Sequence, residues 1–152
     1  MTIQMYLADD QATQQLGARL AAHRPPQAVV HLHGDLGAGK STLARALLRA
    51  LGVTGTIRSP TYTLVERYPL ADGREAWHMD LYRIGDPGEL DFLGLDEGLA
   101  SLWLVEWPQR GARALPPVDL EVHLAIEGDG RQATLAGASA AGKAWLAALS
   151  DQ

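Results

Sequence analysis

The segment Gly34–Ser41, which reads GDLGAGKS, constrains this chain more than any other. Two of its glycines are separated by four residues and are followed by Lys40 and Ser41, as in phosphate-binding loops. Glycines let the backbone N–H groups of such a loop approach phosphate oxygens, and the helix that follows adds partial positive charge. We therefore expect Lys40 to reach the β- and γ-phosphates of a nucleotide, and the Ser41 hydroxyl to bind Mg²⁺.

The segments on both sides of this loop agree with that interpretation. Residues 28–33 form a short apolar run that predicts a buried strand, and residues 41–51 predict a helix with one apolar face. The chain contains eleven arginines and only two lysines, yet it has a lysine where a compact point charge suits phosphate. A glycine-rich turn that precedes a helix by chance is the alternative, and these flanks disfavour it.

Composition narrows the class of protein. At 152 residues, with 47% hydrophobic and 20% charged residues, the chain is expected to form one soluble domain over residues 1–152. A net charge of −5 argues against a large nucleic-acid surface of its own, because such surfaces are basic. The absence of cysteine excludes disulfides and thiol nucleophiles, and the absence of asparagine removes the Asn-Lys-x-Asp motif that reads guanine, which favours ATP. The sequence shows neither a signal stretch nor a membrane-spanning run, so we expect a cytoplasmic protein without membrane contact.

The remaining pattern predicts an α/β fold of the three-layer P-loop NTPase type, with central parallel strands flanked by antiparallel hairpins. A helix is expected from Asp9 or Asp10 to about residue 22, a short helix after Asp86, and a last helix capped by Ser139. Strands are expected at residues 2–7, 63–68, 75–80, 102–106, 120–126 and 131–135.

A phosphate loop needs carboxylates nearby, and these lie where a central strand ends. Glu106 ends the most apolar strand and is the expected Mg²⁺ ligand, while Asp80 ends another and is expected either to support the metal ligands or to orient water. A solvated charge at a strand end is the alternative for both. Thr61 follows the loop helix where γ-phosphate sensors occur, although a polar turn stiffened by proline explains it equally well. His31 and His33 share one strand face, but no third ligand is spaced to join them, so a metal site is not expected there.

Four segments, in the order in which they occur here, give the chain a resemblance to the bacterial TsaE family, also called YjeE. They are GDLGAGKST at residues 34–42, SPTYTLVE at 59–66, HMDLYR at 78–83 and LVEWP at 104–108. The resemblance implies a small P-loop ATPase that binds ATP and Mg²⁺ and is required for threonylcarbamoyladenosine at position 37 of tRNAs reading codons that start with adenine. The family usually has Thr where this chain has Ser41, which keeps the hydroxyl ligand.

The resemblance also assigns roles to individual residues. It implies that Ser41 and Glu106 bind Mg²⁺, that Lys40, Asp80, Glu106 and Thr61 serve hydrolysis, and that Trp107 belongs to the site. The implied nucleotide contacts are Asp10, Leu36, Gly37, Ala38, Gly39, Lys40, Ser41, Thr42, Trp107, Gln109 and Arg131. Asp10, Gln109 and Arg131 rest on weaker local matches.

The resemblance further implies two partner proteins, TsaB and TsaD, of which TsaD transfers the threonylcarbamoyl group. The chain would then meet tRNA only indirectly, through the complex, which agrees with its negative charge. Two other functions are considered beside this one. A small-molecule kinase would need an acceptor pocket and an arginine lid, for which Arg110 and Arg113 are the only candidates. A nucleotide-dependent binding module would bind ATP without hydrolysing it.

Overall fold

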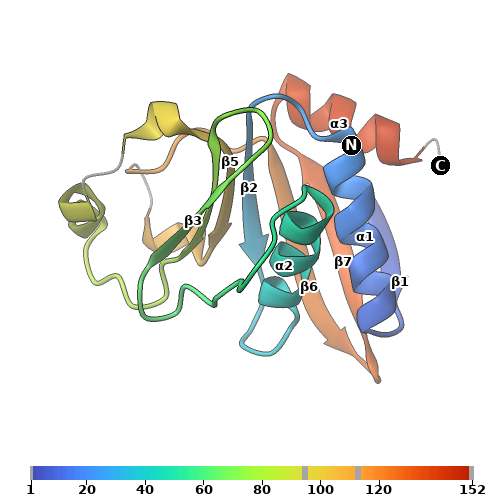
Figure 1. Ribbon diagram of the computed structural model, residues 1–152. Coiled ribbons are helices and arrows are strands. Elements are labelled where there is room, and N and C mark those ends of the chain that lie inside the picture. Colours follow the sequence, from blue (N-terminus) through green and yellow to red (C-terminus); the bar gives the residue numbers. More distant parts are fainter. Residues whose placement is uncertain (1, 94–95, 112–113, 151–152) are drawn as a thin grey trace.

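The computed structural model describes residues 2–93, 96–111 and 114–150, and these form a seven-stranded sheet (Figure 1). The strand order is β1-β7-β6-β2-β5-β4-β3, in which β6, β2, β5 and β4 run parallel to one another. Antiparallel pairs complete both edges, β3 on one side and β7 with β1 on the other. The strands are β1 (Thr2–Leu7), β2 (Ala28–His33), β3 (Val65–Pro69), β4 (Glu75–Asp80), β5 (Ala100–Glu106), β6 (Leu120–Glu127) and β7 (Gly130–Gly137). The predicted fold class is confirmed.

Three helices pack on one face of this sheet (Figure 1). They are α1 (Asp10–His23), α2 (Lys40–Ala50) and α3 (Ala140–Ser150). Alternate residues of β2, Val30 and Leu32, point into the same core as the apolar stripe of α2, which includes Leu43 and Leu47. None of the helices among the described residues has the length and apolar character that crossing a membrane requires.

The other face of the sheet carries a second, smaller core around Trp77 and Trp103, whose rings lie 4.9 Å apart. Leu81, Ile84 and Leu90, from the chain that follows β4, cover it. The short helix expected after Asp86 is the 3-10 helix η1 (Pro87–Leu93) rather than an α-helix, and η2 (Glu97–Leu99) follows. This second layer is therefore built from 3-10 turns and loops.

The parallel strands position the carboxylates at one edge of the sheet. Every residue of β5 is buried, as predicted for a central strand covered on both faces. In the β4–β5 pair, Asp80 lies opposite Glu106, and in the β2–β5 pair Leu32 lies opposite Glu106. The ends of β2, β5 and β4 therefore bring the glycine loop and both carboxylates to the same place.

Candidate functional site

The glycine loop connects β2 directly to α2. Gly34 adopts a φ of +148°, and a side chain there would meet the Leu124 carbonyl oxygen at 2.5 Å, so only glycine fits. Gly39 is the N-cap of α2, with a φ of +105° and no side-chain cap on the helix N-terminus. The first N–H groups of α2 are thus available to an anion, and the helix dipole favours one.

Lys40 is the first residue of α2 and is only 5% exposed. Its Nζ donates a 2.5 Å hydrogen bond to the Gly34 carbonyl and lies 4.1 Å from the centre of the Trp107 ring. Burial lowers the pKa of the Lys40 ammonium, while Glu106, Asp80 and Asp35 oppose that shift. The ammonium therefore lies folded back across the loop, beside both carboxylates.

Glu106 connects the loop helix to the sheet. Its Oε2 accepts a 3.1 Å hydrogen bond from the Ser41 hydroxyl and lies 2.6 Å from His78 Nε2. Glu106 is 3% exposed and His78 is 2% exposed, so the contact between them is buried. A hydroxyl and a carboxylate held this close form an oxygen pair of the kind that binds Mg²⁺.

Asp80 lies beside Glu106 on the neighbouring strand and is 7% exposed. Its Oδ2 accepts a 3.5 Å hydrogen bond from the Thr61 hydroxyl, and its Oδ1 accepts one of 3.0 Å from the Tyr82 backbone N–H. The Thr61 hydroxyl also lies 2.7 Å from the Ser59 hydroxyl. This polar chain connects the segment after α2 to the carboxylate edge, where a water could be oriented.

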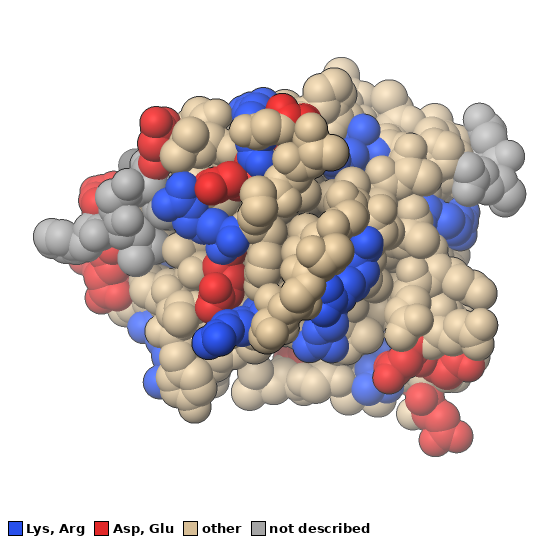
Figure 2. Space-filling model, viewed as in Figure 1, with Lys and Arg blue, Asp and Glu red and all other residues tan. Residues whose placement is uncertain are grey.

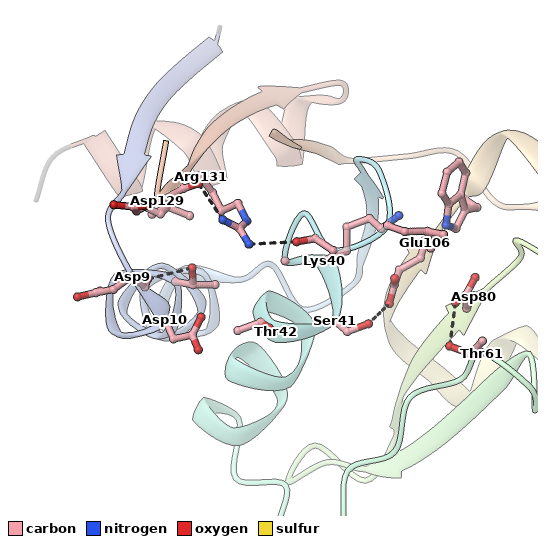
Figure 3. A pocket seen from close by; sticks show the side chains of 17 residues that line it. Asp9, Asp10, Lys40, Ser41, Thr42, Thr61, Asp80, Glu106, Asp129 and Arg131 are labelled. Atoms are coloured by element: carbon pink, nitrogen blue, oxygen red, sulfur yellow. Dashed lines mark hydrogen bonds between the residues drawn. The ribbon is translucent and has the colours of Figure 1, made fainter. Parts of the chain in front are cut away.

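A pocket of about 310 Å³ opens over the loop, between these carboxylates and α1 (Figure 3). Asp9, the N-cap of α1, and Asp10 lie on the wall opposite Glu106. Arg131, near the start of β7, reaches the glycine loop, where its Nε and a terminal nitrogen donate 3.1 Å hydrogen bonds to the Ala38 and Gly37 carbonyls. Arg131 therefore holds the loop backbone and borders the pocket at once.

Most of the residues assigned to the site from the sequence line this one pocket. They are Asp10, Leu36, Gly37, Gly39, Lys40, Ser41, Thr42, Thr61, Asp80, Glu106, Trp107 and Arg131. Ala38 and Gln109 are not among its lining residues. Ala38 is buried, and its N–H donates to the Asp35 carbonyl within the loop, while Gln109 is exposed in η3 (Pro108–Arg110). A nucleotide contact of either residue stays a prediction.

The sequence did not place several residues of this pocket or its support in the site. Leu7, Asp9, Thr13, Asp129 and Gly130 also line it, and His78 contacts Glu106 behind it. Asp129 lies in the turn between β6 and β7 and Gly130 begins β7, so both directly precede Arg131 in the sequence, a signal that could have found them. His78 alternates with Asp80 on β4, but only the pairing of β4 with β5, which places His78 opposite Leu104 and diagonal to Glu106, reveals this contact.

Trp107 has the left-handed backbone conformation, with φ of 56° and ψ of 50°. This conformation is rare and strained for a bulky residue, and such strain concentrates at functional sites. It turns the chain directly after Glu106 and sets the indole against Lys40 and, at 5.0 Å between ring centres, against Tyr82. The loop lysine is thereby covered by an aromatic wall of the pocket.

Comparison with known proteins identifies relatives of this chain. The family model described as "Threonylcarbamoyl adenosine biosynthesis protein TsaE" matches residues 7–134. The tRNA threonylcarbamoyladenosine biosynthesis protein TsaE of Haemophilus influenzae is 37% identical over 157 aligned positions, which cover 99% of each chain. The protein of the same name from Bacillus subtilis is 38% identical over 120 positions, covering 77% of this chain and 73% of that one.

A solved structure has the same fold. The crystal structure of Bacillus subtilis YdiB superimposes with a TM-score of 0.81 and 28% sequence identity. The match covers 99% of this chain and 95% of that chain. The sheet, the loop and the helices described above therefore follow an architecture already seen by crystallography.

Proposed function

The chain belongs to the TsaE family, and from this premise we propose that it is a Mg²⁺-dependent ATPase of tRNA threonylcarbamoyladenosine biosynthesis. The family names point to the pathway, and the pocket supports the chemistry. The observation that carries the proposal is the convergence of an uncapped helix N-terminus, a buried lysine and a hydroxyl–carboxylate pair at one sheet edge. These groups suit a triphosphate and its divalent ion.

Each group has a separate task in this proposal. The loop N–H groups and Lys40 would hold the phosphates, and Ser41 with Glu106 would hold Mg²⁺, which neutralises the phosphate charge when it is bound. Asp80, oriented by Thr61 and the Tyr82 N–H, would position the attacking water. Bound nucleotide would draw Lys40 away from the Gly34 carbonyl, its partner here.

We further propose that TsaB and TsaD are the partners of this chain and that tRNA is handled by the complex. The net charge of −5 supports that division of labour. On the face seen in Figure 2, Lys and Arg side chains lie in separate groups among uncharged side chains, and Asp and Glu side chains lie beside some of these groups. This face is therefore not the broad basic surface that a nucleic acid would need.

The test is a phosphate-release assay on the purified chain, alone and with the TsaB–TsaD pair, using Lys40→Ala as the inactive reference. Slow turnover alone, faster turnover with the pair and none above background for Lys40→Ala are expected. ATP binding without phosphate release under both conditions would instead identify a nucleotide-dependent binding module. Phosphate transfer to a metabolite rather than to water would identify a small-molecule kinase.

A further inference from the structure

Two histidines and a glutamate come together on the sheet face opposite α1, α2 and α3. His31 and His33 alternate with the core residues of β2, and Glu121 of β6 lies opposite His31 in the parallel pair. One ligand atom from each of the three lies within 4.8 Å of the other two. His33 Nε2 is already 3.1 Å from Glu121 Oε1. The expectation that these histidines have no third ligand is wrong, because Glu121 offers a carboxylate oxygen close to both. Glu121 is 88 residues beyond His33 in sequence, so spacing along the chain could not reveal it.

We propose that His31, His33 and Glu121 bind a divalent transition-metal ion of the Zn²⁺ class. Two imidazole nitrogens and one carboxylate oxygen suit such an ion, whereas Mg²⁺ and Ca²⁺ prefer oxygen ligands throughout. The same ligand set, with an open fourth position, holds zinc in several enzymes. Ligands of a tetrahedral ion lie about 3.4 Å apart when metal–ligand bonds are about 2.1 Å. The three ligand atoms now lie within 4.8 Å of one another, and the Glu121 side chain, 35% exposed, has room to move toward both histidines.

The surroundings of both histidines favour the neutral imidazole and fix the orientation of the His33 ring. Metals bind neutral imidazole. Burial and the neighbouring His33 lower the pKa of His31 to about 4, and burial together with His123 lowers the pKa of His33. Glu121 opposes both shifts, yet the pKa of each histidine stays below its usual value. The ring of His123 stacks on that of His33, with 4.3 Å between centres and 7° between planes, which fixes the orientation of His33.

His31 also lacks a partner that a buried polar atom normally has. Its Nε2 is buried and makes no hydrogen bond to any part of the chain that the structure describes. Such an atom costs free energy unless it is paired. A metal shared with His33 and Glu121 would give the His31 ring the partner it lacks.

This site is separate from the nucleotide pocket, because none of its three residues is among the residues that line that pocket. The inference therefore goes beyond the proposed function and survives if ATP hydrolysis is refuted. His33 immediately precedes Gly34, so the two sites still share the strand that leads into the loop.

The experiment is a Co²⁺ titration of the purified chain without nucleotide, followed by visible absorption, with Zn²⁺ added afterwards as competitor. One Co²⁺ per chain, displaced by Zn²⁺, is expected. His33→Gln and Glu121→Gln are each expected to weaken binding about tenfold or more, since even an outer-shell change has an effect of that size. Glu121→Gln keeps the size of the side chain, so it reports on ligation even if a histidine variant folds poorly.

Two control variants separate this site from other binding. His23→Gln removes a histidine of α1, on the helical face, and should leave Co²⁺ affinity unchanged. Glu106→Gln disables the expected Mg²⁺ ligand and should also leave it unchanged. Absence of stoichiometric Co²⁺ binding, unaltered binding in both cluster variants, or loss of binding in Glu106→Gln would each overturn the proposal.

Discussion

The Ser41 hydroxyl donates a 3.1 Å hydrogen bond to the Glu106 carboxylate, although 65 residues separate them in sequence. Ser41 lies in the first turn of α2, and Glu106 is the last residue of β5. The strand that carries the loop, β2, pairs in parallel with β5 and places Leu32 opposite Glu106. The register of two central strands thus determines whether the hydroxyl and the carboxylate can share an ion.

Replacement of Glu106 by Gln should damage turnover far more than nucleotide binding. Gln keeps the shape and a hydrogen-bond acceptor for Ser41, but it removes the negative charge that a divalent ion needs. We expect phosphate release to fall on the order of 100-fold, while ATP affinity measured without Mg²⁺ changes little. Glu97→Gln, on the exposed 3-10 helix η2, is the matched control. Equal turnover in the two variants would remove Glu106 from the site.

Changes at Ser41 should affect the Mg²⁺ requirement. Ser41→Ala removes the hydroxyl ligand, a loss of about 1 to 2 kcal/mol, so half-maximal turnover should need roughly tenfold more Mg²⁺. Ser41→Thr keeps the hydroxyl and should behave like the parent chain. A Mg²⁺ titration of phosphate release compares the three proteins. If Ala and Thr shift the curve equally, the hydroxyl is not a ligand.

Lys40→Ala should weaken ATP binding about 100-fold, because about 3 kcal/mol of charge-assisted contact with phosphate is lost. Lys143→Ala provides the control, since it removes the other lysine from an exposed position on α3. Calorimetric titration with ATP measures both variants. Full ATP affinity in Lys40→Ala would contradict the assignment of the loop.

The predictable part of this molecule is local. The β2 strand, the glycine loop and α2 follow each other along the chain, so glycine placement and apolar spacing were enough to identify them. Glu106 could also be predicted, because ligands bind at the carboxyl ends of central strands, and locating such an end requires no knowledge of how the strands pair. The start of η1 was predicted from Asp86, whose carbonyl accepts from the Glu89 N–H. The type of helix was not predicted, since start signals do not determine whether a short segment closes as α or 3-10.

Contacts that depend on strand register could not be predicted from the sequence. Alternation placed His78 on a strand and His31 on a strand face, but only pairing shows which residues they meet. The β4–β5 register places His78 opposite Leu104, so that its ring contacts Glu106 diagonally across the two strands, and the β2–β6 register places Glu121 opposite His31. Both pairings join residues far apart in sequence, and hydrophobic pattern alone carries no information about such offsets.

Asp72 should stabilise the fold, and its contribution should depend on pH. It lies in the turn between β3 and β4, where its Oδ2 accepts a 2.6 Å hydrogen bond from the buried Ser101 and a 3.3 Å bond from Arg24. The bond from Ser101, followed by that from the Arg74 N–H, holds the pKa of Asp72 below its usual value of 3.8. Asp72→Ala should cost about 1 to 3 kcal/mol at pH 7, because the Ser101 hydroxyl loses its acceptor.

The sign of the pH effect follows from the lowered pKa of Asp72. A carboxyl whose pKa is depressed by folding stabilises the native state above its unfolded value, and it loses that effect as pH falls through the folded value. The stability difference between the parent chain and Asp72→Ala should therefore be constant from pH 7 to about 5 and shrink below pH 3.8. Urea unfolding at several pH values measures it, with the exposed Asp91→Ala as control. A difference that does not vary with pH would show that the charge is irrelevant.

Trp107 should report nucleotide binding through its fluorescence. The other three tryptophans, Trp77, Trp103 and Trp145, are at most 3% exposed, whereas Trp107 is half-buried and lines the pocket. Its ring lies 4.1 Å from the ammonium of Lys40, which must leave the Gly34 carbonyl to reach a phosphate. ATP should therefore change the tryptophan emission of the parent chain, and Trp107→Phe should abolish that change while keeping an aromatic ring over Lys40. Trp103→Phe, checked for folding by circular dichroism, should retain it. An ATP response that persists in Trp107→Phe would mean that bound nucleotide leaves the wall beside Lys40 undisturbed.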